Sequence, residues 1–392
     1  MKICFYCDSI FTFGGVQRVL AVMAKELSKK HEITILTLDD PSLEDTTMYE
    51  LYEANIKYIF LRYSKSPLHE FIPSKAYSFL YKKILPQNKL FSTWYGYSSF
   101  PKSKRKHLIN VLNKGNYDVV VGVHVFLSFH LASIKNKTSS KLVGWMHNSY
   151  DAFFEIDTGY VKNLYNFFKY QMKELSRVIV LSNHDRNLYI QKFGIYPRVI
   201  YNPLTILPDG KAQGNKKFLA IGRFSPLHKG FDILIKAFAL FAEHDSEWTL
   251  DIVGDGPEKK YFESLIEEYA LHDRISIYPF TKDIGTFYKN ASVYILSSRW
   301  EGQALVILEA LSFGLPLITS AIPITEEILD NKGVALFFEN ENPEDLCRKM
   351  VEMANLEEDK LTGMSDNALL FVKNFSISEI IPRWEELLHD LE

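Results

Sequence analysis

A stretch in the last third of the chain limits the possible folds most strongly, because it is apolar on almost every side and yet carries a carboxylate. Residues 297–316 read as the end of a strand, a sharp turn at Gly302 and a helix that stops at Gly314. Glycine just past a helix with proline soon after is a typical stop signal. Apolar residues around the whole circumference indicate a helix buried on most sides, but Glu309 lies in its middle. A buried carboxylate is costly unless hydrogen bonds compensate, so a polar group must meet Glu309.

A second acid and a helix N-terminus lie close to Glu309 in the sequence. Glu301 stands on the turn, eight residues before Glu309. The amides that open a helix have no partner within it and can bind an anion. After Gly302, we expect these to be the amides of Gln303, Ala304, Leu305 and Val306. The segment thus offers a carboxylate, an anion site and a second carboxylate, which suits the sugar, diphosphate and ribose of a nucleotide-sugar.

With seven residues between them, Glu301 and Glu309 resemble the paired glutamates of retaining glycosyltransferases with the GT-B fold, and of glycosyltransferase family 4 in particular. The resemblance implies that Glu301 contacts the donor sugar and that Glu309 holds the ribose. The alternative is that Glu309 pairs with a structural arginine and Glu301 is an ordinary acid of a loop.

Composition indicates a globular protein of two domains. The chain has 392 residues, of which 47% are hydrophobic and 24% charged, and it is long enough for two separate cores. No apolar run approaches the ~20 residues that span a bilayer, and the first residues read as a strand rather than a signal peptide. Cys4 and Cys7 lack the second pair of a zinc site, so we expect buried thiols in a reducing cytoplasm.

The first half alternates strands and helices, which predicts a doubly wound parallel sheet with ligands at the carboxyl ends of its strands. Gly14 and Gly15 separate the first strand from the first helix, and His147 follows a strand at residues 141–146. The family resemblance implies that the glycine pair lies beside the donor diphosphate and the acceptor, and that His147 is an active-site histidine. A plain tight turn and a structural histidine remain alternatives.

The second half begins again with a strand at residues 217–221 and a glycine-bearing loop that contains Arg223 and Lys229. These two resemble the family's clamp on the donor diphosphate. Arginine forks onto phosphate oxygens and lysine adds a mobile charge. The resemblance further implies that the backbone of Phe280, Thr281 and Lys282 receives the nucleobase.

Residues 62–107 are strongly basic in a chain whose formal net charge is −3. They contain ten Lys or Arg residues and one acid, Glu70, with aromatic residues interleaved. This composition suits a segment lying on anionic lipid, and no nucleic-acid recognition motif accompanies it. A solvated basic face over a local aromatic core is the alternative.

Together these patterns predict an α/β protein of the GT-B fold, with two Rossmann-like domains facing a central cleft. We expect an N-terminal acceptor-side domain at 1–204, a nucleotide-sugar domain at 205–375, and a final helix at 376–392 that packs back on the first. The expected reaction moves a hexose from a nucleoside-diphosphate sugar, UDP on family grounds, to a lipid-linked saccharide of a surface polysaccharide, with retention. The catalytic residues would be Glu301, His147, Arg223 and Lys229.

We expect no metal and no cofactor, because the protein supplies the positive charge itself. The expected location is the cytoplasm, at the inner face of the cell membrane. Gln303 stands where many relatives carry an aromatic or aliphatic residue, which leaves the sugar open. Another GT-B enzyme, such as an epimerase, and a non-catalytic donor-binding subunit are the alternatives.

Overall fold

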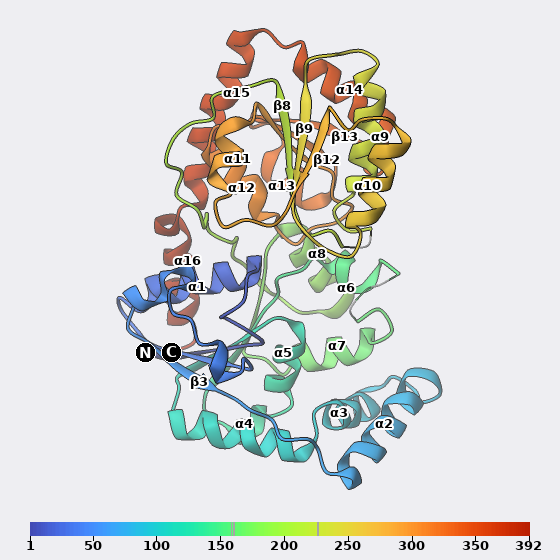
Figure 1. Cartoon of the computed structure of the whole chain (residues 1–392). Helices are drawn as coiled ribbons and strands as arrows, with labels where there is room; N and C mark the ends of the chain where they lie inside the picture. The colour runs from blue at the N-terminus through green and yellow to red at the C-terminus, as the bar shows by residue number, and fades with distance from the viewer. Residues whose placement is uncertain (158, 160, 226) are drawn as a thin grey trace. The chain divides into compact units, whose positions relative to one another are not determined.

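Strands and helices alternate along the chain and form two separate parallel sheets (Figure 1). The computed structural model describes residues 1–157, 159, 161–225 and 227–392. One unit comprises Met1–Pro203 and Ile377–Glu392, and the other comprises Leu204–Ser376. The two sheets confirm the predicted α/β class with two doubly wound parallel sheets.

The first unit is built on a seven-stranded sheet in the order β3-β2-β1-β4-β5-β6-β7. Its central strands are rich in Val and Ile and buried on both faces, as expected where helices cover both sides of a parallel sheet. The strands are β1 (Lys2–Cys7), β2 (Glu32–Thr37), β3 (Ile56–Phe60), β4 (Val119–Val123), β5 (Lys141–Trp145), β6 (Arg177–Val180) and β7 (Arg198–Val199). Strand β3 was not predicted; it is an edge strand with only partly buried residues, so its hydrophobic pattern is weak.

Nine α-helices are described in the first unit, the last of them from the C-terminal end of the chain. They are α1 (Gly15–Leu27), α2 (Leu68–Lys83), α3 (Lys89–Ser99), α4 (Lys102–Gly115), α5 (Val125–Ala132), α6 (Tyr150–Phe154), α7 (Tyr165–Met172), α8 (Asn183–Phe193) and α16 (Ile377–His389). Trp384 of α16 packs against Phe5 of β1 and Trp145 of β5, with ring centroids 6.1 and 4.7 Å apart. These buried rings attach α16 to the sheet of the first unit.

The second unit has a six-stranded sheet in the order β10-β9-β8-β11-β12-β13. Its strands are β8 (Lys217–Ile221), β9 (Thr249–Val253), β10 (Ile275–Tyr278), β11 (Val293–Leu296), β12 (Leu317–Ser320) and β13 (Ala335–Phe338). Its α-helices are α9 (Phe231–Ala242), α10 (Lys259–Glu268), α11 (Gly285–Asn290), α12 (Leu305–Ser312), α13 (Pro323–Leu329), α14 (Pro343–Ala354) and α15 (Glu358–Phe371). Figure 1 shows α9, α10 and α14 on one side of this sheet and α11, α12 and α15 on the other.

The strand order of each sheet reverses at one position. In the first unit the reversal falls between β1 and β4, and in the second it falls between β8 and β11. Loops that leave two such strands diverge, and ligands of doubly wound sheets bind in the crevice they leave at the carboxyl ends. The loops after β8 and β11 are therefore the first place to search for a site in the second unit.

None of the helices that the structure describes is long and apolar enough to cross a membrane. The three cysteines, Cys4, Cys7 and Cys347, are buried and unpaired.

Candidate functional site

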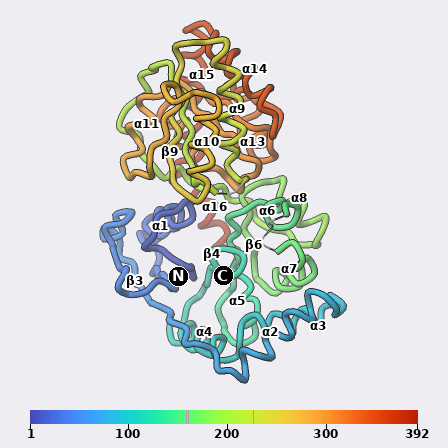
Figure 2. Tube along the Cα trace, turned by 45° about the vertical axis from the view of Figure 1, so that its right-hand side comes forward, coloured from blue at the N-terminus to red at the C-terminus, as the bar shows by residue number. Residues whose placement is uncertain are grey.

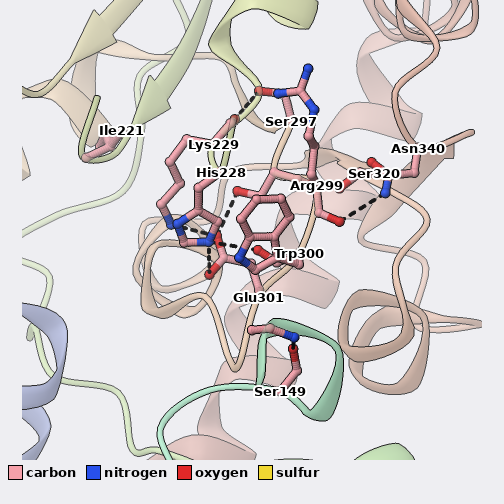
Figure 3. Close-up of polar contacts among 12 residues, drawn as sticks. Ser149, Ile221, His228, Lys229, Ser297, Arg299, Trp300, Glu301, Ser320 and Asn340 are labelled. Carbon is pink, nitrogen blue, oxygen red and sulfur yellow. Dashed lines mark hydrogen bonds and ion pairs between the residues drawn. The ribbon is translucent and has the colours of Figure 1, made fainter. Parts of the chain in front are cut away.

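The loops after β8 and β11 meet through an ion pair between Lys229 and Glu301 (Figure 3). The Lys229 Nζ lies 2.6 Å from Glu301 Oε1, although the two residues are 72 positions apart in the chain. The Ser297 hydroxyl donates to the Lys229 carbonyl oxygen over 2.9 Å. Two of the predicted site residues are thus brought together at the point where the strand order reverses.

Glu301 is a buried anion surrounded by donors. The Ser298 hydroxyl donates to Oε1 over 2.7 Å, and His228 Nε2 lies 3.8 Å from Oε2. Burial alone would raise the pKa of Glu301, but the charges of Lys229 and His228 and the hydrogen bonds from Lys229 and Ser298 hold it below its ordinary value. The carboxylate therefore remains ionised at neutral pH and can accept hydrogen bonds from hydroxyl groups of a ligand.

Arg299 ties the two loops together behind this ion pair. Its guanidinium makes two hydrogen bonds to Asp232, of 3.0 and 2.8 Å, and a third of 2.7 Å to the Leu227 carbonyl oxygen. The imidazole of His228 donates to the Trp300 carbonyl oxygen over 2.9 Å and stacks on the indole of Trp300. Our sequence reading missed Arg299 and His228. The sequence did contain a hint of this contact: an arginine lies next to the Glu301 turn, and an acid, Asp232, lies in the first turn of α9.

Gly230 permits the close approach of the two loops. Its φ is +62°, and a Cβ atom built there would lie 2.0 Å from the Ser297 carbonyl oxygen. Any side chain at this position would push apart the loops that carry Lys229 and Glu301.

Helix α12 begins slightly later than predicted. Ala304 is its N-cap and Leu305 its first residue, so the amides of its open first turn begin at Ala304. Gln303, which we expected among them, lies in the preceding turn with Gly302. Leu305 and Val306 are in the first turn as predicted, and no side chain caps it. The N-cap of α12 lies three residues after the buried Glu301.

Glu309 is fully buried in the middle of α12, and the polar group that meets it is a tyrosine. The phenol of Tyr288 donates to Glu309 Oε2 over 2.9 Å. Tyr288 itself stacks on Phe313, with ring centroids 5.2 Å apart. The sequence required a polar partner for the buried carboxylate of Glu309, and the Tyr288 hydroxyl is such a partner. The alternative reading expected an arginine in this role.

The other predicted donor residues of the second unit lie on two different loops, one after β8 and one after β10. Arg223 is on the loop after β8, where its side chain is exposed and makes no ion pair among the described residues. Phe280, Thr281 and Lys282 follow β10, the edge strand. Phe280 is 55% exposed, and the Thr281 hydroxyl accepts a hydrogen bond from the Asp283 amide.

In the first unit, the glycine pair is held by a tyrosine. Gly14 is the N-cap of α1 and its amide donates to the Tyr49 hydroxyl over 3.1 Å. That hydroxyl in turn donates to the Thr12 carbonyl oxygen over 2.9 Å. The loop between β1 and Gly15 is thus fixed in shape before any ligand arrives, and the Gly14 amide already has a partner.

His147 follows β5 by two residues and is buried. Its Nε2 has no hydrogen-bond partner among the described residues, and its ring lies 4.3 Å from that of Trp145. Burial, with a smaller contribution from His124, lowers the pKa of His147 to about 3. It is therefore a neutral imidazole at physiological pH, able to donate or accept one hydrogen bond.

His124 was missed in the sequence. It directly follows β4, at the position where the strand order of the first sheet reverses, and its φ of 111° is rare for a residue other than glycine. Burial lowers its pKa to about 4. Backbone strain of this kind persists mainly at functional sites. The sequence did contain a hint of His124, because a histidine stands at the end of a predicted strand here, as His147 does at the end of another.

Two family models together match nearly the whole chain. The model described as Glycosyltransferase Family 4 matches residues 13–206, and Glycosyl transferases group 1 matches residues 208–369. An uncharacterised glycosyltransferase of Haemophilus influenzae is 31% identical over 54% of this chain and 61% of its own length. One from Methanocaldococcus jannaschii is 30% identical, over 62% of this chain and 67% of its own.

One relative and one solved structure match over nearly the whole of this chain. The O-antigen biosynthesis glycosyltransferase WclY of Escherichia coli is 24% identical over 96% of this chain and 95% of its own. The crystal structure of HepE from Anabaena in complex with UDP-glucose superposes with a TM-score of 0.77 at 17% identity, covering all of both chains. The likeness to HepE supports the two-domain GT-B fold.

Proposed function

This chain belongs to the group 1 glycosyltransferases of family 4, and we propose that it moves a hexose from a UDP-sugar to a saccharide acceptor during synthesis of a surface polysaccharide. The UDP carrier is supported by the UDP-glucose complex of HepE. The kind of product is supported by the O-antigen role in the name of WclY. The proposal extends to a lipid-linked acceptor, reached in the cytoplasm at the inner face of the membrane.

The ion pair between Lys229 and Glu301 at the start of α12 is the observation that carries this proposal. A donor diphosphate placed at the α12 N-terminus would bring two negative charges to the Lys229 ammonium, which would then be shared between phosphate and Glu301. Glu301 would be left to accept hydrogen bonds from hydroxyls of the sugar. Arg223, exposed on the same loop, would supply a second cation to the diphosphate.

In the proposed reaction, the acceptor hydroxyl oxygen attacks C1 of the sugar while the bond from C1 to the diphosphate oxygen breaks. Its proton passes to the departing diphosphate on the same face, so the anomeric configuration is retained. Charge grows on the diphosphate as the bond breaks. Lys229, Arg223 and the first amides of α12 would stabilise that charge, which makes this mainly electrostatic catalysis. Glu309 would bind the ribose hydroxyls.

A panel of nucleotide-sugars tests the proposal. Purified protein is scored for thermal shift and for slow release of nucleoside diphosphate, and the anomeric configuration of any transferred sugar is read by NMR. We expect UDP-hexoses to stabilise the protein and to be hydrolysed. The Glu301→Gln variant should reduce hydrolysis, whereas Lys260→Ala, on the exposed side of α10, should not change it. Binding without any turnover across the panel would instead favour a donor-binding subunit, and an inverted product would refute retention.

A further inference from the structure

Helix α2 exposes its apolar side. The residues that it turns toward the rest of the unit include Glu70, Ser74, Tyr77 and the buried Tyr81. Its exposed large apolar residues include Leu68, Phe71, Ile72 and Phe79, which lie at helical spacing and are 73%, 47%, 61% and 62% exposed. A helix on the surface of a globular protein normally shows the opposite arrangement.

Helix α3 repeats this inversion. Leu90, Trp94 and Tyr97 lie at helical spacing and are 62%, 60% and 47% exposed, while Ser92 and Gly96 are buried. The two helices lie side by side in both views (Figures 1 and 2). Residues 68–99, from here on the α2–α3 hairpin, therefore carry exposed apolar side chains on both of their helices.

The α2–α3 hairpin is a packed element, so these exposures do not reflect a loose segment. The Tyr81 and Ser92 hydroxyls are 2.7 Å apart, and the rings of Tyr81 and Tyr95 stack at 4.5 Å. The ring of Tyr95 packs edge-on against Phe167 of α7 at 4.8 Å. The hairpin buries one side on the unit and holds the other side out in a fixed shape.

The exposed charges of the hairpin are positive. Lys75, Lys82, Lys83 and Lys89 are exposed. The single acid, Glu70, is used internally, because it accepts hydrogen bonds from both the hydroxyl and the amide of Ser103, at 2.6 and 3.2 Å. The outer face therefore combines apolar side chains with uncompensated cations.

A basic cavity of about 350 Å³, open to solvent, lies at the base of the hairpin, and one of its cations, Arg62, already pairs with Asp40 over 2.8 Å. It is lined by Arg62, Tyr63, Ser64, Ser103, Lys104 and His107. Ser103 is the residue bonded to Glu70 in the first turn of α2, which places the cavity close to the start of that helix. The ammonium of Lys104 is held 5.5 Å above the Tyr63 ring, so a cation is positioned at the cavity wall.

We propose that the α2–α3 hairpin docks on an anionic lipid bilayer, with its outward apolar side chains at the boundary of headgroups and acyl chains and a lipid phosphate in the basic cavity. The helices have 16 and 11 residues and are too short to span the bilayer, so they lie in its surface. The exposed lysines attract the anionic headgroups. This inference does not depend on the proposed sugar transfer, and its test uses no donor.

Trp94 provides the measurement. It is the one exposed tryptophan among the described residues, since Trp145, Trp248 and Trp384 are buried and Trp300 is half-buried. Protein is mixed with vesicles of equimolar phosphatidylcholine and phosphatidylglycerol, or of phosphatidylcholine alone. We expect sedimentation and a blue shift of fluorescence with the mixed vesicles only, reversed by salt as charge is screened. Equal binding to both vesicles, or to neither, overturns the proposal.

Variants separate the apolar contact from the phosphate contact. Phe79→Ser and Trp94→Ser should each weaken vesicle binding about tenfold, from the loss of one buried side chain. Tyr196→Ser removes an equally exposed ring elsewhere in the unit and should have no effect. Lys104→Gln should weaken binding to mixed vesicles, whereas Lys114→Gln, at the exposed far end of α4, should not. All of these variants should retain donor hydrolysis.

Inorganic pyrophosphate distinguishes a lipid phosphate from a free one. We expect it to compete with vesicles only weakly, because it cannot engage the apolar face. Tight pyrophosphate binding that requires Lys104, with no vesicle binding, would refute lipid docking. A dimer that dissociates on Phe79→Ser substitution in the absence of lipid would also refute it, since the face would then bind protein.

Arg105 must be left intact in these experiments. Its guanidinium donates to the Tyr97 and Phe100 carbonyl oxygens over 2.8 and 2.7 Å and covers the Tyr97 ring. Although it belongs to the basic run from Lys102 to Lys106, its role is to fix the junction between α3 and α4. Its loss would disturb the hairpin itself.

Discussion

Lys229 and Arg223 are both cations of the loop after β8, but they differ in what they already contact. Lys229 balances the buried Glu301, whereas the Arg223 side chain is exposed and makes no ion pair among the described residues. Replacing either by Ala should lower turnover by roughly 10²–10³-fold, the usual effect of losing one transition-state donor. Lys229→Ala should have a second effect, because burial then dominates and raises the pKa of Glu301.

The pH profile separates these two variants. A raised Glu301 pKa means that activity of Lys229→Ala falls as pH drops, with an acidic limb absent from the wild type. Arg223→Ala should keep the wild-type profile. Turnover close to wild type at saturating donor, in either variant, would remove that residue from the diphosphate site, and identical profiles would argue that Lys229 does not hold Glu301 ionised.

Glu309 offers a second prediction at this scale. Glu309→Gln should weaken binding of the free nucleoside diphosphate and of the donor equally, by about 1.5–3 kcal/mol, the range for a hydrogen bond to a charged group. Glu301→Gln should leave the free diphosphate unaffected and reduce only sugar transfer. Calorimetry with UDP and with the sugar donor measures both. The same loss in both variants would contradict the separate roles assigned to the two acids.

At the scale of elements, the loop after β1 depends on one hydroxyl. Tyr49 lies in a short 3-10 helix (η2, Met48–Glu53), and both Tyr49 and Glu50 have left-handed φ angles of 55° and 54°. Such residues cost of order 1–3 kcal/mol each. The Lys25 ammonium contacts this turn, donating to the Tyr49 carbonyl oxygen over 3.4 Å and lying 3.3 Å from Glu50. The strained turn delivers the Tyr49 hydroxyl to Gly14 and Thr12.

Tyr49→Phe should therefore loosen the glycine loop. Two hydrogen bonds are lost, each worth about 0.5–1.5 kcal/mol. We expect a drop in kcat/KM of roughly tenfold, carried mainly by KM, with a small decrease in Tm. Tyr52→Phe is the matched control, because Tyr52 lies in the same short helix with its side chain 63% exposed. Equal effects in the two variants would mean that Tyr49 has no special part in the loop.

Some elements of the fold could be predicted well from the sequence and others could not be predicted at all. The helix around Glu309, its stop at Gly314 and the two parallel sheets could be predicted because each has a local signal: hydrophobic pattern, capping residues or alternation. Strand β3 lacked a pattern because it is half-buried at a sheet edge. The Arg299 network was missed because its partners, Asp232 and Leu227, lie 67 and 72 residues away. The family resemblance itself is confirmed, since both halves match their models.

At the scale of the whole molecule, buried histidines predict how stability changes with pH. Burial lowers the pKa of His124, His130 and His147 to about 4, 3 and 3, from an ordinary 6.5. These side chains stay neutral in the folded protein at a pH where they are protonated in the unfolded chain. The unfolded state then binds more protons, so stability is lost as pH falls below 6.5.

Each buried histidine contributes a slope of at most about 1.4 kcal/mol per pH unit in that window. Urea unfolding at pH 7 and pH 5 measures it. His130→Gln should reduce the slope, whatever it does to stability at pH 7, whereas His69→Gln on the exposed side of α2 should not. A stability independent of pH between 7 and 5 would contradict the buried neutral state of these histidines.

The attachment of α16 to the first unit also determines when that unit can finish folding during synthesis on the ribosome. The chain leaves the first unit at Pro203 and returns only at Ile377, so the entire second unit emerges in between. Until then Phe5 and Trp145 have no Trp384 to cover them, and the nascent first unit presents an aromatic surface to chaperones and to other chains. The second unit is translated without interruption and can fold while that aromatic surface is still uncovered. The domain whose synthesis starts first is therefore the one that is finished last.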